Sequence, residues 1–231
     1  MTTEDPVIEF QDAGFSYGAS DVLGDMTLSL APGAFHFLVG PSGSGKTTFL
    51  RLCYMDLEPT SGSISFFGHR IAPHDRNAIA DLRRAVGVVH QECQFLVHLP
   101  LLENISLPLL VSGIDMRERS DDLQALLEWV DLTDRVDALP PELSGGERQR
   151  AAVARAVILS PQVILADEPT GNVDHDMAMR VLTLLIELNR MGKTVLIATH
   201  DLDLIRAAKA RVQARVLRID HGRVHLAGAD L

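Results

Sequence analysis

The stretch "FHFLVGPSGSGKTTF", Phe35 to Phe49, decides the fold. It opens with a short apolar run that ends at Gly40, as a buried strand does. The segment "GPSGSGKT" that follows matches the phosphate-loop pattern G-x-x-x-x-G-K-[ST], and a helix is expected to begin at Lys46. A chance glycine-rich turn is the alternative, but it does not account for a strand, a helix and the Lys-Thr pair together. The stretch therefore predicts a phosphate-binding loop.

The glycines of this loop would let backbone amides turn inward onto phosphate oxygens, and the helix dipole adds positive potential. We expect Lys46 to reach the β- and γ-phosphates of a nucleotide and the Thr47 hydroxyl to ligate Mg²⁺. The residues expected to hold the phosphates of ATP are Gly40, Pro41, Ser42, Gly43, Ser44, Gly45, Lys46, Thr47 and Thr48.

Three further apolar runs have the character of buried strands. They are "AVGVVHQ" ending at Gln91, "QVILADE" ending at Glu168 and "TVLIATH" ending at His200. Because they do not alternate between apolar and polar residues, they favour a parallel sheet that is covered on both faces. Helical stretches lie between them, which predicts an α/β core. These stretches are Lys46 to Tyr54, Ser120 to Val130, Glu147 to Leu159 and Met177 to Arg190.

Both ends of the chain predict additional strands. Residues Val7 to Leu30 contain short strand-like runs that we expect to be broken at Gly14, Gly18 and Gly24. Near the other end, "ARVLRIDHGRVHLAG" predicts two strands joined by a turn at His221-Gly222.

The ends of the core strands carry polar side chains suited to chemistry on a phosphate. Asp167 suits a Mg²⁺ ion, and Glu168 is placed to polarise a water molecule. Ordinary strand-terminal carboxylates are the alternative, which the nearby phosphate loop disfavours. Because ligands of open α/β sheets bind beyond the carboxyl ends of the strands, we expect Gly40, Gln91, Asp167, Glu168 and His200 to converge there.

The segment "LSGGERQR", Leu143 to Arg150, predicts a helix start with an unusual composition. Ser144 and Glu147 form a capping box, but Gly145 and Gly146 each cost roughly 1 kcal/mol relative to Ala in a helix turn. A bare, amide-rich helix start is a second anion site. The phosphate loop of the same chain already binds the phosphates of its own ATP. We therefore expect this helix tip to contact the ATP bound to a second copy in a twofold pair. On this segment alone, a plain capped helix with accidental glycines stays an alternative.

Composition bounds the remaining possibilities. The chain has 231 residues and a net charge of −10. Its overall negative charge does not attract nucleic acid, which is also negative, so we expect no nucleic-acid partner. Cys53 and Cys93 lack metal-like spacing and are expected to be free thiols in a reducing cytosol. The start "MTTEDPVIEF" is unlike a signal peptide, and no apolar run approaches the ~18 residues of a membrane span.

Together these motifs resemble the ATP-binding subunit of ABC transporters along almost the whole chain. "GPSGSGKTT" is similar to Walker A, "VILADE" to Walker B and "LSGGERQR" to the ABC signature. The resemblance implies a P-loop NTPase (RecA-like) core with an N-terminal antiparallel β region. It further implies a single ABC ATPase domain, residues 1–231, with a helical subdomain inserted at about 92–159. Dimerisation around two ATP and hydrolysis of ATP with Mg²⁺ are expected.

The resemblance also assigns roles to single residues. Tyr17 would stack on adenine, Glu168 would be the general base and His200 would contact the γ-phosphate. Gln91 resembles the Q-loop glutamine, and Asp174 ends the D-loop "GNVD". The implied catalytic set is Glu168, His200 and Gln91, the implied metal set is Thr47, Gln91 and Asp167, and the implied contacts to the ATP of the opposite subunit are Ser144, Gly145, Gly146 and Glu147.

Within the family, "ELSGGERQR" and "LADEPTGNVD" are similar to the branch of lipoprotein-release, macrolide-export and cell-division ATPases. "FHFLVGPSGSGKTTFLRLCYMDLEPTSGSISFFGH" and "LRRAVGVVHQ" look most like the cell-division members. That likeness implies a homodimer on the cytoplasmic side of the plasma membrane. An integral membrane partner similar to FtsX would dock near Gln91 and receive a conformational signal.

Some positions depart from the pattern of the family. Related chains commonly have an aromatic residue before the Q-loop glutamine and an Asp-aromatic pair after it, where this chain has His90, Glu92 and Cys93. Val173 replaces the usual Leu of the D-loop. Two alternatives stay open: the ATPase of a lipoprotein-release or macrolide-export complex, and a soluble ABC ATPase acting on DNA or ribosomes. The acidic charge and the lack of a long coiled-coil insertion count against the second.

Overall fold

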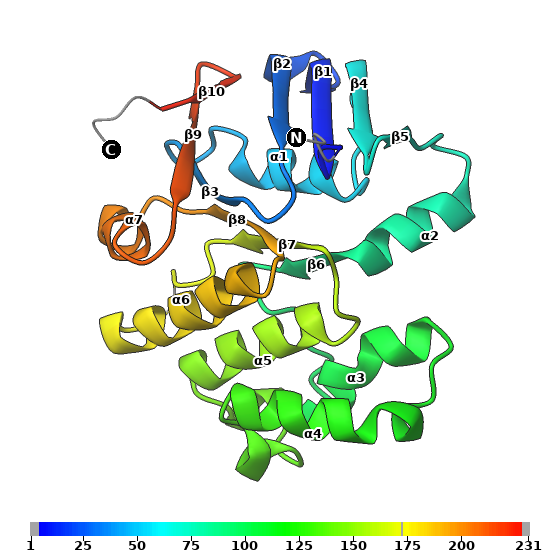
Figure 1. Cartoon of the computed structure of the whole chain (residues 1–231), viewed down its shortest axis with the longest axis vertical. Coiled ribbons are helices and arrows are strands. Elements are labelled where there is room, and N and C mark those ends of the chain that lie inside the picture. Colours follow the sequence, from blue (N-terminus) through cyan, green and yellow to red (C-terminus); the bar gives the residue numbers. More distant parts are fainter. Residues whose placement is uncertain (1–4, 172, 228–231) are drawn as a thin grey trace.

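A computed structural model describes residues 5–171 and 173–227, and within them the strands form two sheets (Figure 1). The larger sheet has the strand order β10-β9-β3-β8-β7-β6, in which only β10 runs antiparallel to its neighbour. Its strands are β3 (Phe35–Val39), β6 (Val86–Val89), β7 (Val163–Asp167), β8 (Thr194–Ala198), β9 (Ala214–Asp220) and β10 (Arg223–Leu226). The predicted parallel core is thereby confirmed.

The second sheet is antiparallel, with the order β2-β1-β4-β5. Its strands are β1 (Ile8–Tyr17), β2 (Ser20–Leu30), β4 (Ser61–Phe66) and β5 (His69–Arg70). The prediction that Gly14 and Gly24 break the strands is wrong. β1 continues through Gly14, where its register shifts, and β2 continues through Gly24; of these three glycines, only Gly18 lies in a turn.

The hairpin predicted near the end of the chain is present. His221 and Gly222 join β9 to β10 with φ angles of 47° and 75°. Positive φ at both central residues is the signature of a type I′ turn, whose twist matches that of the paired strands.

The remaining helices of the core surround these sheets (Figure 1). They are α1 (Lys46–Cys53), α2 (Arg76–Ala85), α6 (His175–Arg190) and α7 (Leu202–Lys209). The sequence did not predict α2, whose ten residues include three arginines and a single buried side chain, Leu82. Helix α6 begins two residues before the predicted start, because the Asp174 side chain accepts a hydrogen bond from Met177 N and caps it.

A helical region lies between β6 and β7 in the chain, on the side of the parallel sheet away from the antiparallel sheet (Figure 1). It contains α3 (Leu101–Val111), α4 (Ser120–Trp129), α5 (Gly145–Val157) and the 3₁₀ turns Met116–Arg119, Thr133–Arg135 and Pro140–Glu142. The Trp129 indole donates a 2.7 Å hydrogen bond to Glu187 of α6, which ties α4 to the core.

Two apolar clusters cover the two faces of the parallel sheet. Phe35 and Phe37 of β3 belong to the cluster that includes α5 and α6. Leu38 follows Phe37 in β3 and points to the opposite face of the sheet. It belongs to the second cluster, together with Phe10 of β1 and Phe49 of α1. Both faces of the sheet are buried. Polar functional side chains are therefore expected at the edge formed by the carboxyl ends of β3, β6, β7 and β8.

Candidate functional site

The loop between β3 and α1 has the geometry of a phosphate cradle. Gly45 stands at the N-cap of α1 with φ at 102°, a left-handed conformation that glycine adopts without strain. A Cβ on Gly40 would lie 2.6 Å from Ser44 Oγ and 3.0 Å from the carbonyl oxygen of Ile219, so a larger residue there would require both neighbours to move. The Ser44 hydroxyl is buried and has no hydrogen-bond partner in the described part of the chain.

Lys46 is held inside this loop. Its side chain is buried, and Nζ donates hydrogen bonds to the carbonyl oxygens of Gly40 at 3.0 Å and Pro41 at 3.3 Å. Nζ also lies 3.7 Å from Glu168 Oε1. The ammonium group is therefore fixed between the loop and the end of β7, where it can meet an anion.

Thr47 and Asp167 meet as the sequence predicts. Thr47 Oγ1 donates a 2.7 Å hydrogen bond to Asp167 Oδ2. Burial raises the pKa of Asp167, and the charge of Glu168 adds to this effect, while the hydrogen bond from Thr47 opposes it. Raising the pKa disfavours the ionised form unless a cation lies nearby.

The oxygen donors of this pair fit a Mg²⁺ ion. Mg²⁺ prefers hard oxygen ligands and usually keeps only one or two from the protein, with phosphate oxygens and water completing its shell. Within residues 5–171 and 173–227, no cluster of three or more His, Cys, Asp or Glu side chains could hold a metal. Gln91, the third predicted ligand, is exposed after β6, and in the described residues no hydrogen bond joins it to Thr47 or Asp167.

Glu168 follows β7, and both its backbone and its side chain are held in place. It is buried, and its backbone has φ at 44°, in the left-handed region that non-glycine residues rarely occupy. His200 Nδ1 lies 3.0 Å and 3.1 Å from the two carboxylate oxygens. Strain of this kind persists where the surroundings enforce it and clusters at active sites. Of the five residues predicted to converge on this edge, Gly40, Asp167, Glu168 and His200 are linked through Lys46, Thr47 and direct contacts, whereas within the described residues no hydrogen bond or ion pair joins Gln91 to them.

The start of α5 contains the predicted capping box. Glu147 N donates to Ser144 Oγ at 3.2 Å, and Ser144 N donates to Glu147 Oε2 at 2.7 Å. The hydrogen bond from Ser144 lowers the pKa of Glu147 to about 2, assisted by Arg135, whose Nε donates to Oε1. The Glu147 carboxylate is thus engaged within its own chain.

The two signature glycines differ in their surroundings. Gly145 is partly exposed, whereas Gly146 is buried, and a Cβ there would lie 2.4 Å from Cγ of Met177. Arg150 lies one turn further along α5 and donates to Met177 Sδ at 3.1 Å. Packing against α6 is therefore one reason for Gly146, which sequence reasoning missed because the contact joins residues far apart in the chain.

Two further predicted residues lie at the borders of the site. Tyr17 ends β1, is half exposed, and accepts a 3.3 Å hydrogen bond from Arg51 of α1. Asp174 caps α6. Asn172, which belongs to the same predicted D-loop, lies outside the described residues.

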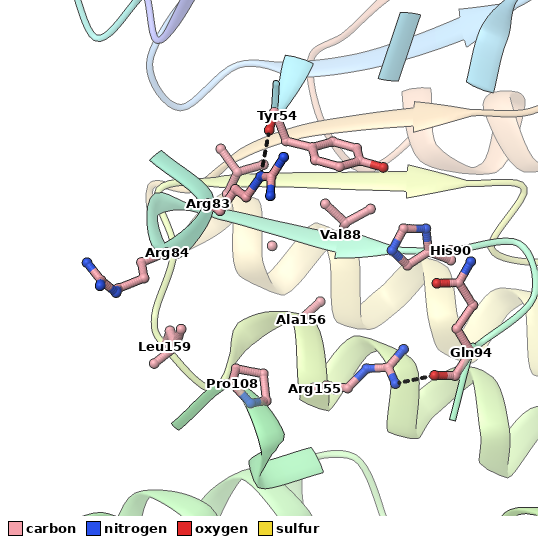
Figure 2. Close-up of a pocket in the computed structure, with 12 residues that line it drawn as sticks. Tyr54, Arg83, Arg84, Val88, His90, Gln94, Pro108, Arg155, Ala156 and Leu159 are labelled. Carbon is pink, nitrogen blue, oxygen red and sulfur yellow. Dashed lines mark hydrogen bonds between the residues drawn. The ribbon is translucent and has the colours of Figure 1, made fainter. Parts of the chain in front are cut away.

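A groove lies between the helical region and the core, next to the loop that carries Gln91. Figure 2 shows Val88, His90 and Gln94 from β6 and the loop after it, and Pro108 and Arg155 from the helices. Arg155 Nη1 donates to the Gln94 carbonyl oxygen at 3.0 Å, and Nη2 donates to that of Cys93. One arginine of α5 therefore holds two consecutive carbonyls of this loop.

The phosphate loop, the strand-end carboxylates and the inserted helices define a P-loop nucleoside triphosphatase of the ATP-binding-cassette type. The family profile described as "ABC transporter" matches residues 23–171. The chain belongs to this family, as its motifs predicted, and it is an ATP-binding and ATP-hydrolysing subunit.

Comparisons with curated proteins give relatives that match over most of their length. The cell division ATP-binding protein FtsE of Haemophilus influenzae is 40% identical over 202 residues, which cover 87% of this chain and 93% of that protein. FtsE of Escherichia coli K12 is 39% identical over 223 residues, covering 95% and 97%.

Solved structures agree with the fold. A dimeric bacterial ABC transporter cassette, MJ0796, superimposes with a TM-score of 0.84 at 31% identity, covering 94% of this chain and 96% of that one. A dimeric post-hydrolysis state of the same cassette, bound to ADP and phosphate, gives a TM-score of 0.83 at 29% identity with the same coverage. The predicted α/β fold with an ABC nucleotide-binding architecture is confirmed.

Proposed function

We propose that the chain is the ATP-hydrolysing subunit of an ABC-type membrane complex that acts in bacterial cell division. It works as a homodimer that closes on two ATP molecules with Mg²⁺. The likeness to FtsE proteins over nearly the whole chain supports the cell-division role. The observation that carries the enzymatic part is the meeting of Lys46, Glu168 and His200 beside the phosphate loop.

The roles of the phosphate-loop and strand-end residues follow from their chemistry, and those of Tyr17 and Gln91 follow from the resemblance to the family. Backbone amides of Gly40 to Thr48 and the Lys46 ammonium bind the phosphates of ATP, while Tyr17 stacks on adenine. Thr47 and Asp167 would hold Mg²⁺, and Gln91 would reach it only if the loop after β6 brings it to this pair; the bound ion would neutralise charge on the phosphate oxygens. These assignments use the oxygen donors and the fixed ammonium group described above.

Hydrolysis needs a base that removes a proton from the attacking water. Glu168 takes this proton while the water attacks the γ-phosphorus and the bond to the β-phosphate oxygen breaks. The contact with His200 Nδ1 orients the Glu168 carboxylate, because an ionised carboxylate can only accept a hydrogen bond. The exposed remainder of the His200 ring is free to contact the γ-phosphate.

The second half of each ATP site comes from the partner copy. Ser144 and Gly145 are at or near the surface at the start of α5, and their backbone amides can approach the γ-phosphate of the facing copy. Asp174 caps α6, and Met177 in the first turn of α6 packs on Gly146, so the start of α6 contacts the signature. The similar cassette MJ0796 is dimeric in its solved structures, which supports a dimer of this chain.

An integral membrane protein similar to FtsX holds the dimer at the cytoplasmic side of the plasma membrane. None of the helices between residues 5 and 227, position 172 aside, combines the length and the apolar character that a bilayer span requires. The groove beside the Gln91 loop offers the partner a docking place that touches both the helical region and the core. Release of the γ-phosphate relaxes the dimer, and this motion is the signal.

Purification of the tagged chain from detergent-solubilised membranes tests this proposal. An ATP-dependent dimer that hydrolyses ATP and carries one polytopic membrane protein of the FtsX type is the expected result. Recovery of a lipoprotein-release or macrolide-export permease instead would replace the cell-division role with transport. A complex with DNA or ribosomes and no membrane protein would overturn the proposal.

A further inference from the structure

Tyr17, the residue expected to stack on adenine, has a ring that is partly packed and partly free. It ends β1, and its ring meets the Phe15 ring edge to face, with the ring centroids 4.7 Å apart and the planes at 83°. Aromatic rings attract each other in this arrangement. Phe15 is buried, whereas Tyr17 is half exposed. The exposed part of the Tyr17 ring is therefore available to a flat ligand such as a purine base.

Arg51 holds the hydroxyl end of the same ring. Its Nη1 donates a 3.3 Å hydrogen bond to Tyr17 Oη, although the two residues are 34 positions apart in the chain. Arg51 belongs to the last turn of α1, the helix that begins with Lys46 at the phosphate loop. One helix thus serves both ends of the proposed nucleotide site, the phosphate end through Lys46 and the base end through Arg51.

The Arg51 guanidinium is itself held by a second contact. Its Nε donates a 2.6 Å hydrogen bond to Asp56 Oδ2, and the Asp56 amide donates to the Arg51 carbonyl oxygen at 2.9 Å. Because the guanidinium is planar and uses two of its donors at once, its orientation is fixed. Asp56, Arg51 and Tyr17 therefore form a chain of contacts that ends at the ring.

The Arg51–Asp56 pair does little for the stability of the fold. The two side chains are 37% and 38% exposed, and ion pairs with this exposure contribute little to the free energy of unfolding. Ligand binding, in contrast, gains when a side chain is already held in its bound position, because less conformational entropy is lost on contact. Contacts that fix the Tyr17 ring therefore favour the binding of a base.

We propose that Arg51, held by Asp56, is the positioning residue of Tyr17 and raises the affinity of the site for the base of its nucleotide. The inference rests on the proposed function, because it assumes that Tyr17 stacks on adenine. It adds a residue that acts through the Tyr17 ring rather than on the phosphates.

Two ligands of the isolated chain test this role. Mg-ADP carries the base, whereas Mg-pyrophosphate carries a pair of linked phosphates without it. Arg51→Met removes the donors and nearly keeps the length of the side chain. It should raise the Kd for Mg-ADP roughly three- to fivefold and leave that for Mg-pyrophosphate unchanged. Isothermal titration calorimetry measures both, and a merely structural residue would weaken both ligands alike.

Double variants test whether Arg51 acts through Tyr17. Tyr17→Phe keeps the ring but removes the hydroxyl that accepts the hydrogen bond, so its effect on Mg-ADP should match that of Arg51→Met, and the two effects should not add. Tyr17→Ala removes the ring and should weaken Mg-ADP roughly tenfold or more. In that background, Arg51→Met should have no further effect.

Arg70→Met is the matched control. Arg70 lies on β5 at the edge of the antiparallel sheet and donates a 2.8 Å hydrogen bond to Gln11. Its loss should leave both Kd values unchanged. In steady-state hydrolysis, Arg51→Met should raise the KM for ATP roughly three- to fivefold while kcat stays within about twofold. The unfolding temperature of each variant verifies that it is folded.

The outcomes separate the inference from the proposed function. Unchanged Mg-ADP affinity in Arg51→Met, or full additivity with Tyr17→Phe, would overturn the inference and leave the proposed function standing. Equal weakening of Mg-ADP and Mg-pyrophosphate would also overturn it, because Arg51 would then act on the phosphate loop through α1. Unchanged Mg-ADP affinity in Tyr17→Ala would overturn both the inference and the adenine contact proposed for Tyr17.

Discussion

His200 Nδ1 lies 3.0 Å from Oε1 and 3.1 Å from Oε2 of Glu168, and Lys46 Nζ lies 3.7 Å from the same Oε1. The Glu168 carboxylate is therefore held from two sides by groups that come from separate segments of the chain. Together with its left-handed backbone, this fixes the carboxylate at the end of β7. A carboxylate so fixed, next to a phosphate loop, has the position of a general base.

Glu168→Gln removes the base and nearly preserves the shape. We expect hydrolysis to fall by roughly 10²–10⁴-fold, as the loss of a general base should cause, with ATP binding intact. Because ATP is then not consumed, an ATP-bound dimer should accumulate. Phosphate release and size-exclusion chromatography with ATP measure the two effects.

The matched control is Glu58→Gln, the same chemical change at an exposed position between α1 and β4. It should hydrolyse ATP at the wild-type rate. Wild-type turnover in Glu168→Gln would count against the assigned base.

Ser144→Arg tests the role of the signature tip. The hydroxyl of Ser144 caps α5, and the residue is exposed where a second copy would meet it. A long cation there should block closure of the dimer and turnover but spare ATP binding by the single subunit. Analytical ultracentrifugation with Mg-ATP and a fluorescent-nucleotide titration distinguish the two results.

Loss of the cap costs about 1 kcal/mol, so reduced stability must be separated from lost dimerisation. Ser144→Ala removes the cap without adding bulk and should dimerise better than Ser144→Arg. A Ser144→Arg chain that dimerises and hydrolyses normally would refute the proposed contact across the dimer.

The phosphate loop and the strand-end residues were predictable because their signals are local. "GPSGSGKT" and the apolar runs before Asp167 and His200 are short, continuous patterns, and parallel strands bring their ends to one edge of the sheet. The capping box of α5 was predictable for the same reason, since Ser144 and Glu147 are three residues apart.

Other features depend on contacts that no local pattern encodes. Helix α2 is a short amphipathic helix of ten residues in which only Leu82 is buried, so its assignment depends on the contacts of one side chain with the core. The left-handed φ of Glu168 has no local signal, because a glutamate rarely occupies that region. β1 and β2 continue through Gly14 and Gly24 because the irregular pairing of the antiparallel sheet accommodates these glycines. The neighbouring strands determine that pairing, so the glycines alone do not predict where a strand ends.

Gly146→Ala separates packing from nucleotide contact at the signature. The new Cβ would lie 2.4 Å from Cγ and 2.6 Å from Sδ of Met177. Overpacking of this kind costs about 1–3 kcal/mol, although the flexible methionine can relieve part of it. The urea midpoint of the isolated chain should fall, and the effect is measured without nucleotide.

Met177→Ala removes the side chain that the new methyl group at position 146 would meet. In the double variant Gly146→Ala with Met177→Ala, the new methyl has room, so the two destabilisations should not add. If the double variant regains stability but not ATPase activity, the bare backbone of Gly146 is needed for nucleotide as well as for packing. Strict additivity of the two free energies of unfolding would contradict the packing role.

Asp167→Asn should stabilise the chain without nucleotide while weakening its use of Mg-ATP. Burial raises the pKa of Asp167, so the folded state binds its proton more tightly than the unfolded state does. Stability from this group therefore falls as the pH rises from the unfolded pKa through the folded pKa, and the penalty is complete above it. The neutral amide removes the penalty and can still accept the hydrogen bond from Thr47.

At neutral pH the unfolding temperature of Asp167→Asn should exceed that of the wild type by about 2–4 °C, which corresponds to roughly 1 kcal/mol for a chain of this size. The difference should shrink as the pH falls toward the unfolded pKa of aspartate, because the wild-type carboxyl is then protonated in both states. Asp137→Asn, an exposed counterpart, should show no such trend. Differential scanning calorimetry across pH measures the effect, and a lower unfolding temperature at neutral pH would mean that Lys46 and Thr47 outweigh the burial of the charge.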